Sequence, residues 1–316
     1  MIVVCGEALM DVFDAGATAT GNALDARIGG SPYNVALGLA RLQQPVAFFG
    51  AIGTGFLGQR LMASLAEEGI DTRCVVRTLA PTSMCVIGLD AAGVPAYDFH
   101  GAGGADRQLP LHALAAVPTA PAAIHFGSYA MVVEPVGATQ RALVEREQGR
   151  SVISYDPNVR LTVEPSLSRW RELLDWMLPR TTLLKISEED LGLLYPGRSR
   201  ADFAAQALAA GVKLVVITRG ESGSEAFTAA HHVAAAPVPV VVIDTVGAGD
   251  TFQAALLCAL AEAGRLSIDG IAALEPAALS SLLGFATRAA AITCSRRGAD
   301  LPRRAELQAA TGVRIK

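Results

Sequence analysis

The sequence has no excess of basic residues and few charged residues of either sign. Its 316 residues include 26 Lys and Arg against 30 Asp and Glu, a formal net charge of −4, and 18% are charged while 51% are hydrophobic. A nucleic-acid-binding protein normally carries a basic face, and a disordered chain has too few hydrophobic residues to form a core. The composition therefore argues against both classes and favours a globular protein without a nucleic-acid partner.

Paired cysteines and clustered histidines are also missing. The five cysteines are scattered among apolar or small residues, and no Cys-x-x-Cys pair occurs. We therefore expect reduced, buried thiols and neither a disulfide framework nor a zinc site. His231 and His232 are the one adjacent histidine pair, and neighbouring residues of a strand point to opposite faces, so a shared metal is not expected.

No uninterrupted apolar segment has the form of a membrane span. Three stretches without charged residues, 42–59, 108–133 and 226–243, approach the roughly 20 residues that cross a bilayer. Each contains proline together with glycines or histidines, which break helices or leave polar groups in hydrocarbon. Glu7 precedes any complete signal-peptide hydrophobic region. The sequence thus predicts a cytoplasmic protein without a membrane partner.

Short β-rich runs alternate with segments of helical spacing along the chain. Apolar residues recur at helical intervals in 35–42, 57–66, 170–177 and 252–260. The runs between them are apolar almost throughout, as strands covered on both faces must be: 2–5, 46–52, 84–89, 123–126, 152–155, 182–186, 214–218 and 238–243. This alternation predicts an α/β fold with a mostly parallel central sheet flanked by helices.

Two stretches do not follow that alternation. Residues from about 12 to 28 and from 73 to 100 contain short strand-like runs joined by Gly, Asn and Asp turns, with little helical periodicity. We expect them to form a small separate sheet that grows out of a single domain, 1–316, and serves as a lid over a site.

The segment from Asp244 to Phe252 reads Asp-Thr-Val-Gly-Ala-Gly-Asp-Thr-Phe and lies between a predicted strand and a predicted helix. Residues 247–249 (Gly247, Ala248 and Gly249), hereafter the phosphate cradle, have almost no side chain, so their N–H groups can approach an anion at the positive end of the helix. Asp250 lies where phosphate charge would collect, which suits a general base beside a transferring phosphoryl group. A tight turn with an Asp helix cap is the structural alternative.

Two motifs in this order resemble those of a known family. Gly29-Gly30-Ser31-Pro32-Tyr33-Asn34-Val35-Ala36 and the segment 244–252 are similar to the two signatures of the ribokinase-like, or PfkB, sugar kinases. The resemblance runs the full length of the chain and is strongest to bacterial fructokinases. It is carried further by the segments 6–11, 97–100, 105–107, 125–128, 156–160 and 290–296.

The resemblance implies a ribokinase-like fold and ATP-dependent phosphorylation of a hexose, first of all D-fructose to fructose 6-phosphate, with Mg²⁺ as cofactor. It also implies roles for individual residues. Asp250 matches the family's general base, and the phosphate cradle matches its anion hole. Arg160 matches a residue that reaches the active site in fructokinase-like members. Without the resemblance, Arg160 would be interpreted as part of a surface salt bridge.

On the sugar side, Asp11 and Asn34 match positions that hydrogen-bond sugar hydroxyls, while Gly29 and Gly30 let the ligand lie against the backbone. Carboxylate and amide groups supply the acceptors and donors that polyol recognition needs. Without the resemblance, Asp11 would be an ordinary loop acid and Asn34 an ordinary residue of a first helical turn.

On the nucleotide side, the chain departs from the family pattern. Many relatives carry Asn-x-x-Glu before a helix, with the acid supporting Mg²⁺ through water, whereas this chain has Lys185-Ile-Ser-Glu188. A direct contact from Lys185 to the phosphates is left open, and residues 187–190 also read as a capped helix start. Thr218, Gly220 and Gly223 match a nucleotide-contact turn.

A monovalent-cation site is also implied beside the anion hole, with K⁺ as the candidate ion. It would be formed by Asp244 and the backbone carbonyls of Val246, Thr293, Arg296 and Gly298. Pro302 occupies the place where some relatives have a Ser ligand, so potassium activation is left open.

Three other readings are weighed against the fructokinase. Residues 53–58 fit Gly-x-Gly-x-x-Gly, but no second mononucleotide half follows, so an NAD site is not favoured. A 2-keto-3-deoxygluconate kinase or another sugar kinase of the family is the enzymatic alternative, and a non-catalytic sugar-binding regulator is the alternative from another class. Asp250 argues against the regulator, because a binding module needs no proton acceptor there. The sequence is compatible with a monomer or a homodimer.

Overall fold

A nine-stranded sheet forms the centre of the computed structural model, which describes residues 1–89 and 95–310. Its strand order is β13-β12-β11-β10-β9-β8-β1-β4-β5. Seven of these strands are parallel: β1 (Ile2–Cys5), β4 (Val46–Gly53), β5 (Val75–Thr78), β8 (Ala123–Gly127), β9 (Val152–Asp156), β10 (Leu183–Ser187) and β11 (Leu214–Thr218). An antiparallel hairpin, β12 (Ser224–Phe227) and β13 (His232–Ala235), completes one edge.

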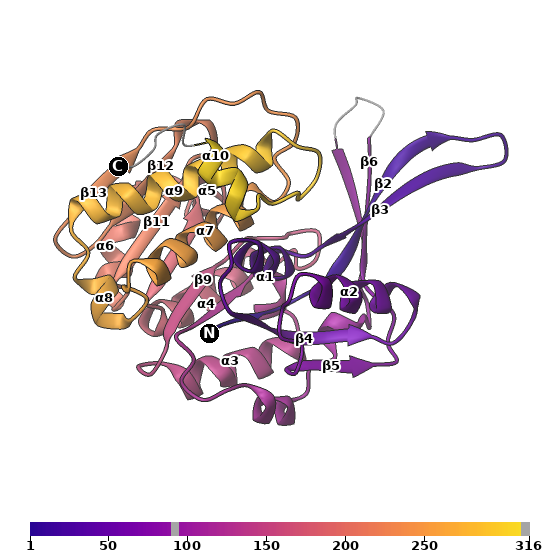
Figure 1. Cartoon of the computed structure of the whole chain (residues 1–316). Coiled ribbons are helices and arrows are strands. Elements are labelled where there is room, and N and C mark those ends of the chain that lie inside the picture. The colour runs from indigo at the N-terminus through magenta and orange to yellow at the C-terminus, as the bar shows by residue number, and fades with distance from the viewer. Residues whose placement is uncertain (90–94, 311–316) are drawn as a thin grey trace.

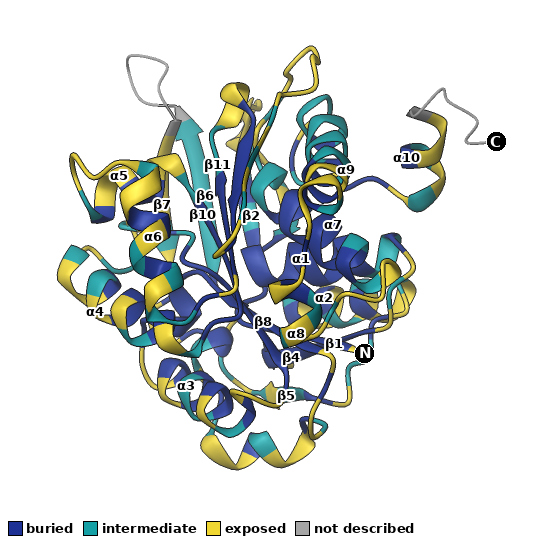
Figure 2. Cartoon of the chain, turned by 90° about the vertical axis from the view of Figure 1, so that its left-hand side faces the viewer, coloured by how far each residue is buried: buried dark blue, intermediate teal, exposed yellow. Residues whose placement is uncertain are grey.

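Helices cover both faces of this sheet (Figure 1). One face packs against α1 (Ser31–Arg41), α2 (Phe56–Glu67), α7 (Ala248–Glu262) and α9 (Pro276–Cys294). The other packs against α3 (Val136–Glu147), α4 (Leu167–Met177), α5 (Glu188–Leu194) and α6 (Arg200–Ala210). Two short helices, α8 (Ile268–Ala272) and α10 (Arg304–Ala310), follow α7 and α9. Figure 2 shows the inner strands of the large sheet, such as β1, β4 and β8, as a buried layer between the helices, which explains their apolar sequences.

A four-stranded sheet projects beyond the edge of the large sheet (Figure 1). It contains, in the order β3-β2-β6-β7, the strands β2 (Leu9–Ala17), β3 (Asn22–Gly29), β6 (Met84–Leu89) and β7 (Pro95–His100). We call these strands the lid. The predicted fold class, a mostly parallel sheet with a small separate sheet, is therefore confirmed. Within the stretch 73–100, however, β5 pairs with β4 in the large sheet, and residues 90–94 lie outside the described residues.

The strand predicted at 238–243 is wrong. The segment is irregular, and its apolar side chains are exposed, with Val241 at 83% and Ile243 at 63%. Pro237 and Pro239 lack the N–H groups that a ladder needs. The segment is instead held at its end, where the Ile243 N–H donates to the carbonyl of Cys294 at 2.8 Å.

Among the described residues, α9 is the one helix with the length and composition of a membrane span. Its inner side contributes Leu279, Leu282 and Leu283 to the core, which explains its apolar character. The three uncharged stretches fold as strands, short helices and irregular segments. All five cysteines are free thiols, as predicted, with Cys85 and Cys294 only partly buried.

Candidate active site

The predicted site residues come from elements whose ends meet between the large sheet and the lid. Parallel strands place their carboxyl ends at one edge, where ligands of α/β proteins bind. The end of β1 continues into the lid strand β2, β3 returns directly to the start of α1, and α7 begins at Ala248. The first turns of α1 and α7 therefore approach each other, which the hydrogen bonds between them demonstrate.

Asp250 is the centre of these contacts. Ser31 Oγ donates to Asp250 Oδ1 at 2.6 Å, and Asn34 Nδ2 donates to Asp250 Oδ2 at 2.8 Å. The Asp250 side chain is buried, and within the described part of the chain the Asn34 Oδ1 atom is buried without a hydrogen-bond partner. The two sequence signatures thus meet in space. The Ser31 contact was missed by the sequence analysis, although Ser31 lies inside the quoted motif.

The phosphate cradle has the conformation that its composition suggests. Gly247 is the N-cap of α7 with a φ of 78° in the left-handed region, which glycine adopts at no steric cost. A Cβ atom there would lie 2.7 Å from the Ala299 Cβ, so the loop after α9 packs against the cradle. Thr251 Oγ1 closes the turn by donating to the Gly247 carbonyl at 2.9 Å. The Ala248 N–H donates to the Thr245 carbonyl at 3.2 Å, so the N–H groups that follow it in the first turn, those of Gly249 and Asp250, are the ones placed to meet an anion.

Lys185 lies directly beside the cradle. Its Nζ donates to Asp156 Oδ2 at 2.7 Å, and both side chains are at most 5% exposed. A Cβ atom added at Gly249 would lie 3.1 Å from this Nζ. The structure therefore brings the ammonium to the cradle, a placement that the sequence left open.

The sugar-side residues gather at the base of the lid. A Cβ atom at Gly29 would lie 2.1 Å from Asp11 Oδ2, and one at Gly30, whose φ is 104°, would lie 2.7 Å from a backbone carbonyl oxygen. Burial raises the pKa of Asp11 to about 6, with Arg160 opposing and Asp250 adding to the rise. The exposed Arg160 and the buried Asp250 thus both act electrostatically on Asp11.

Two buried acids below the lid were given no role by the sequence analysis. Burial raises the pKa of Glu7 to about 8 and also raises that of Asp106. Asp106 accepts hydrogen bonds from Ser83, just before β6, and from Tyr129 Oη at 3.0 Å. Both acids lie inside segments that carry the resemblance, 6–11 and 105–107, and that was the signal that could have drawn attention to them.

The nucleotide-side residues are spread more widely. Glu188, the first residue of α5, forms an ion pair with Arg200, and Ser187 Oγ caps the helix by accepting the Asp190 N–H at 3.0 Å. The predicted helix cap is therefore present.

The turn after β11 contains the other predicted nucleotide-side residues. Thr218 ends the strand, and Gly220 and Gly223 have positive φ angles of 51° and 88°. A Cβ atom at Gly223 would lie 2.1 Å from the Ala235 carbonyl oxygen, so the close approach of the β12–β13 hairpin requires a glycine here. At Gly220 an added Cβ atom would meet open space.

The residues of the implied cation site lie together. Asp244 Oδ1 accepts the Val246 N–H at 3.0 Å, and Oδ2 accepts the Gly298 N–H at 2.8 Å. The Thr293 carbonyl, at the end of α9, accepts the Arg296 N–H at 3.0 Å. A carboxylate with several backbone carbonyls is an oxygen donor set that suits a hard cation, so the residues present fit K⁺.

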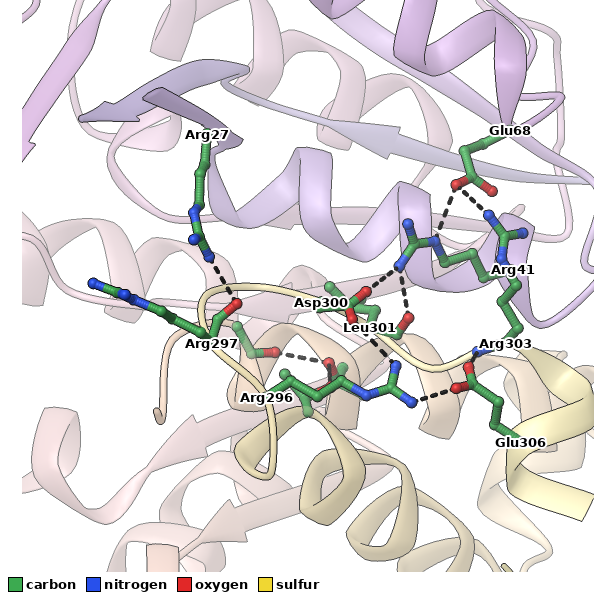
Figure 3. Close-up of polar contacts among 12 residues, drawn as sticks. Arg27, Arg41, Glu68, Arg296, Arg297, Asp300, Leu301, Arg303 and Glu306 are labelled. Atoms are coloured by element: carbon green, nitrogen blue, oxygen red, sulfur yellow. Dashed lines mark hydrogen bonds and ion pairs between the residues drawn. The ribbon is translucent and has the colours of Figure 1, made fainter. Parts of the chain in front are cut away.

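The loop after α9 is connected to the lid and to α1 (Figure 3). Arg27, from the lid strand β3, donates to the Arg297 carbonyl at 2.8 Å. Arg41, at the end of α1, donates to Asp300 Oδ1 at 3.1 Å and to the Leu301 carbonyl at 2.7 Å. The predicted cation site therefore shares one loop with contacts to two other parts of the fold.

Comparisons with known proteins agree with this geometry. A model described as pfkB family carbohydrate kinase matches residues 1–306. A fructokinase from Rhizobium leguminosarum bv. trifolii is 33% identical over 279 residues, covering 88% of this chain and 85% of that protein. The crystal structure of a fructokinase with bound ATP from Xylella fastidiosa superposes with a TM-score of 0.86 at 26% identity, covering 98% of this chain and 97% of that one.

A Vibrio cholerae fructokinase variant, solved with fructose, ADP and a potassium ion, has the same fold. Its TM-score is 0.82 at 24% identity, covering 98% of this chain and 97% of that one.

Proposed function

The chain belongs to the pfkB family of carbohydrate kinases, and on that premise we propose that it transfers the γ-phosphate of ATP to fructose. The observation that carries the proposal is the placement of Asp250, hydrogen-bonded to Ser31 and Asn34 at the start of the helix that presents the phosphate cradle. A carboxylate beside an anion site is unfavourable for simple binding, because it repels phosphate. A carboxylate at this position is, however, suited to accept the proton of the attacking hydroxyl.

The reaction uses these residues in turn. The Asp250 carboxylate takes the proton of the fructose 6-hydroxyl while the hydroxyl oxygen forms a bond to the γ-phosphorus. The bond from that phosphorus to the β–γ bridging oxygen breaks, so the products are fructose 6-phosphate and ADP. The N–H groups of the cradle and the Lys185 ammonium stabilise the negative charge that spreads over the transferred phosphoryl group. Asp11 and Asn34 hold the sugar hydroxyls.

Magnesium would be held chiefly by the nucleotide. Among the described residues, no group of three or more His, Cys, Asp and Glu side chains is arranged for a metal. Mg²⁺ at kinase sites is bound through one or two carboxylates, water and the substrate phosphates, and Glu188, here paired with Arg200, would be a supporting acid. When bound, the ion neutralises charge on the β- and γ-phosphates.

We expect potassium to accelerate the reaction through the Asp244 site. Replacing K⁺ by tetramethylammonium at constant ionic strength should lower kcat, because the cation would support the loop that packs on the phosphate cradle. Initial rates in the two salts measure the effect. A rate that does not depend on the cation would remove potassium from the mechanism.

The proposed activity is tested by incubating the chain with ATP, Mg²⁺ and single sugars and measuring ADP release and sugar phosphate. We expect phosphorylated fructose, in stoichiometric balance with ADP. ATP consumption without a phosphorylated sugar, or sugar binding without turnover, would contradict the proposal, and the latter would favour the non-catalytic regulator.

A further inference from the structure

The buried ion pair between Asp156 and Lys185 lies on two neighbouring strands. Asp156 is the last residue of β9 and Lys185 the third residue of β10, and the parallel register pairs Ser154 with Leu183 and Tyr155 with Leu184. The register therefore continues to Asp156 opposite Lys185. Their side chains extend from the same sheet edge toward the start of α7, where the Nζ lies beside Gly249.

The hydrogen bonds of this pair are incomplete in a way that points to a ligand. In the described part of the chain, Asp156 is the hydrogen-bond partner that the structure gives the Lys185 ammonium, which has three N–H donors. The second carboxylate oxygen, Asp156 Oδ1, is buried without a partner. Unused donors on a buried cation beside an anion cradle are suited to phosphate oxygens.

The charges around the pair explain why the carboxylate is needed. Burying an ammonium without a counter-ion is costly, and a buried lysine readily becomes neutral. His125, on β8, has its pKa lowered to about 3 by burial and by the nearby Lys185 charge, so its imidazole is neutral and cannot balance the ammonium. Asp190, at the start of α5, interacts electrostatically with Lys185, but its Oδ1 accepts a hydrogen bond from the Val159 N–H.

We propose that Asp156 is a positioning residue, which holds the Lys185 ammonium charged and against the phosphate cradle so that it can bind a phosphate oxygen of the nucleotide. The proposal rests on the proposed kinase function, and it names Asp156 as the residue that keeps Lys185 in place for nucleotide binding. Asp156 itself does not touch the reacting atoms. Its effect on catalysis passes through Lys185.

A double-mutant cycle tests this dependence. The variants are Asp156→Asn, Lys185→Met and the two combined, and Glu147→Gln serves as the matched control. Glu147 is another buried, ion-paired carboxylate, which contacts Arg146 and Ser151 just before β9, at the opposite end of that strand from Asp156. The measurements are kcat, KM for ATP and KM for fructose, together with the ADP dissociation constant by calorimetry.

We expect Asp156→Asn to lower kcat/KM for ATP by about tenfold or more and to weaken ADP binding, with KM for fructose changing by less than about twofold. In the Lys185→Met background the same substitution should change these values by less than about twofold, because the group through which Asp156 acts is already gone. Glu147→Gln should leave the kinetics unchanged. Equal losses in both backgrounds, or no loss in either, would overturn the proposal.

The kinetic and ADP-binding measurements can also fail independently, so they distinguish failure of this proposal from failure of the proposed kinase function. If the native chain phosphorylated no sugar, the kinase assignment would fail, and the ADP-binding cycle would still decide the role of Asp156. If Asp156→Asn alone did not fold, the combined variant leaves neither charge unpaired and can be compared with Lys185→Met. Equal ADP affinity in those two variants supports the positioning role, and weaker binding by the combined variant contradicts it.

Discussion

Replacing Asp250 by Asn should lower kcat by about 10² or more, the usual range for loss of a general base. The amide has nearly the same shape and stays between Ser31 and Asn34, but it cannot take the proton of the attacking hydroxyl. Because the substitution also removes a negative charge beside the phosphate cradle, ATP should bind at least as well as in the native chain. The loss is therefore expected in kcat, with KM for ATP and fructose within a few-fold.

The measurement is steady-state kinetics on purified Asp250→Asn, with thermal unfolding to establish that it is folded. Asp202→Asn is the matched control, because Asp202 is also the third residue of a helix, α6, and its exposed carboxylate accepts a hydrogen bond from Ser199, the N-cap of the same helix. The control should keep native kinetics. Native turnover by folded Asp250→Asn would show that another group accepts the proton.

An apolar run in the sequence predicts a strand correctly where the fold buries that run. Runs such as 152–155 and 214–218 are apolar almost throughout because helices cover both faces of the sheet, and they are strands in the structure. The run 238–243 has a similar composition but lies beyond the edge hairpin, where two prolines prevent ladder formation. The four-residue strands β12 and β13 were missed because their short sequences mix polar and small residues, whereas the equally short β1 is apolar throughout.

The candidate site was predictable only as two separate motifs. Ser31 and Asp250 are 219 positions apart, so no local spacing indicates that one donates to the other. The resemblance to sugar kinases identified both motifs, and the structure supplies the contact between them. Lys185 and Asp156 carried a weaker signal, since each is a charged residue in a strand that is otherwise apolar. Their pairing depends on strand order, which composition does not determine.

The choice between fructose and a sugar acid depends on charge at the sugar side. A keto-acid substrate brings a carboxylate, which is costly to bury without a positive partner. Lys185 lies beside Gly249 of the phosphate cradle, where we propose that it binds the nucleotide, and Arg160 already acts on Asp11. On the lid, the exposed Asp98 lies 3.0 Å from His100, so this strand adds a carboxylate and no unopposed cation.

The site should therefore prefer the neutral sugar. We expect kcat/KM for fructose to exceed that for 2-keto-3-deoxygluconate by at least about tenfold, equivalent to about 1.4 kcal/mol in transition-state binding. Both substrates are supplied together at equal concentration with limiting ATP, and the two phosphorylated products are quantified, so that their ratio gives the ratio of kcat/KM directly.

Asp98→Asn provides a further comparison, because removing this lid carboxylate should reduce the ratio of kcat/KM for fructose to that for the keto acid if charge is the cause of the preference. Preferential phosphorylation of the keto acid by the native chain would identify the rival kinase. Phosphorylation of neither would leave the sugar-kinase assignment in place and direct the search to another hexose or to ribose.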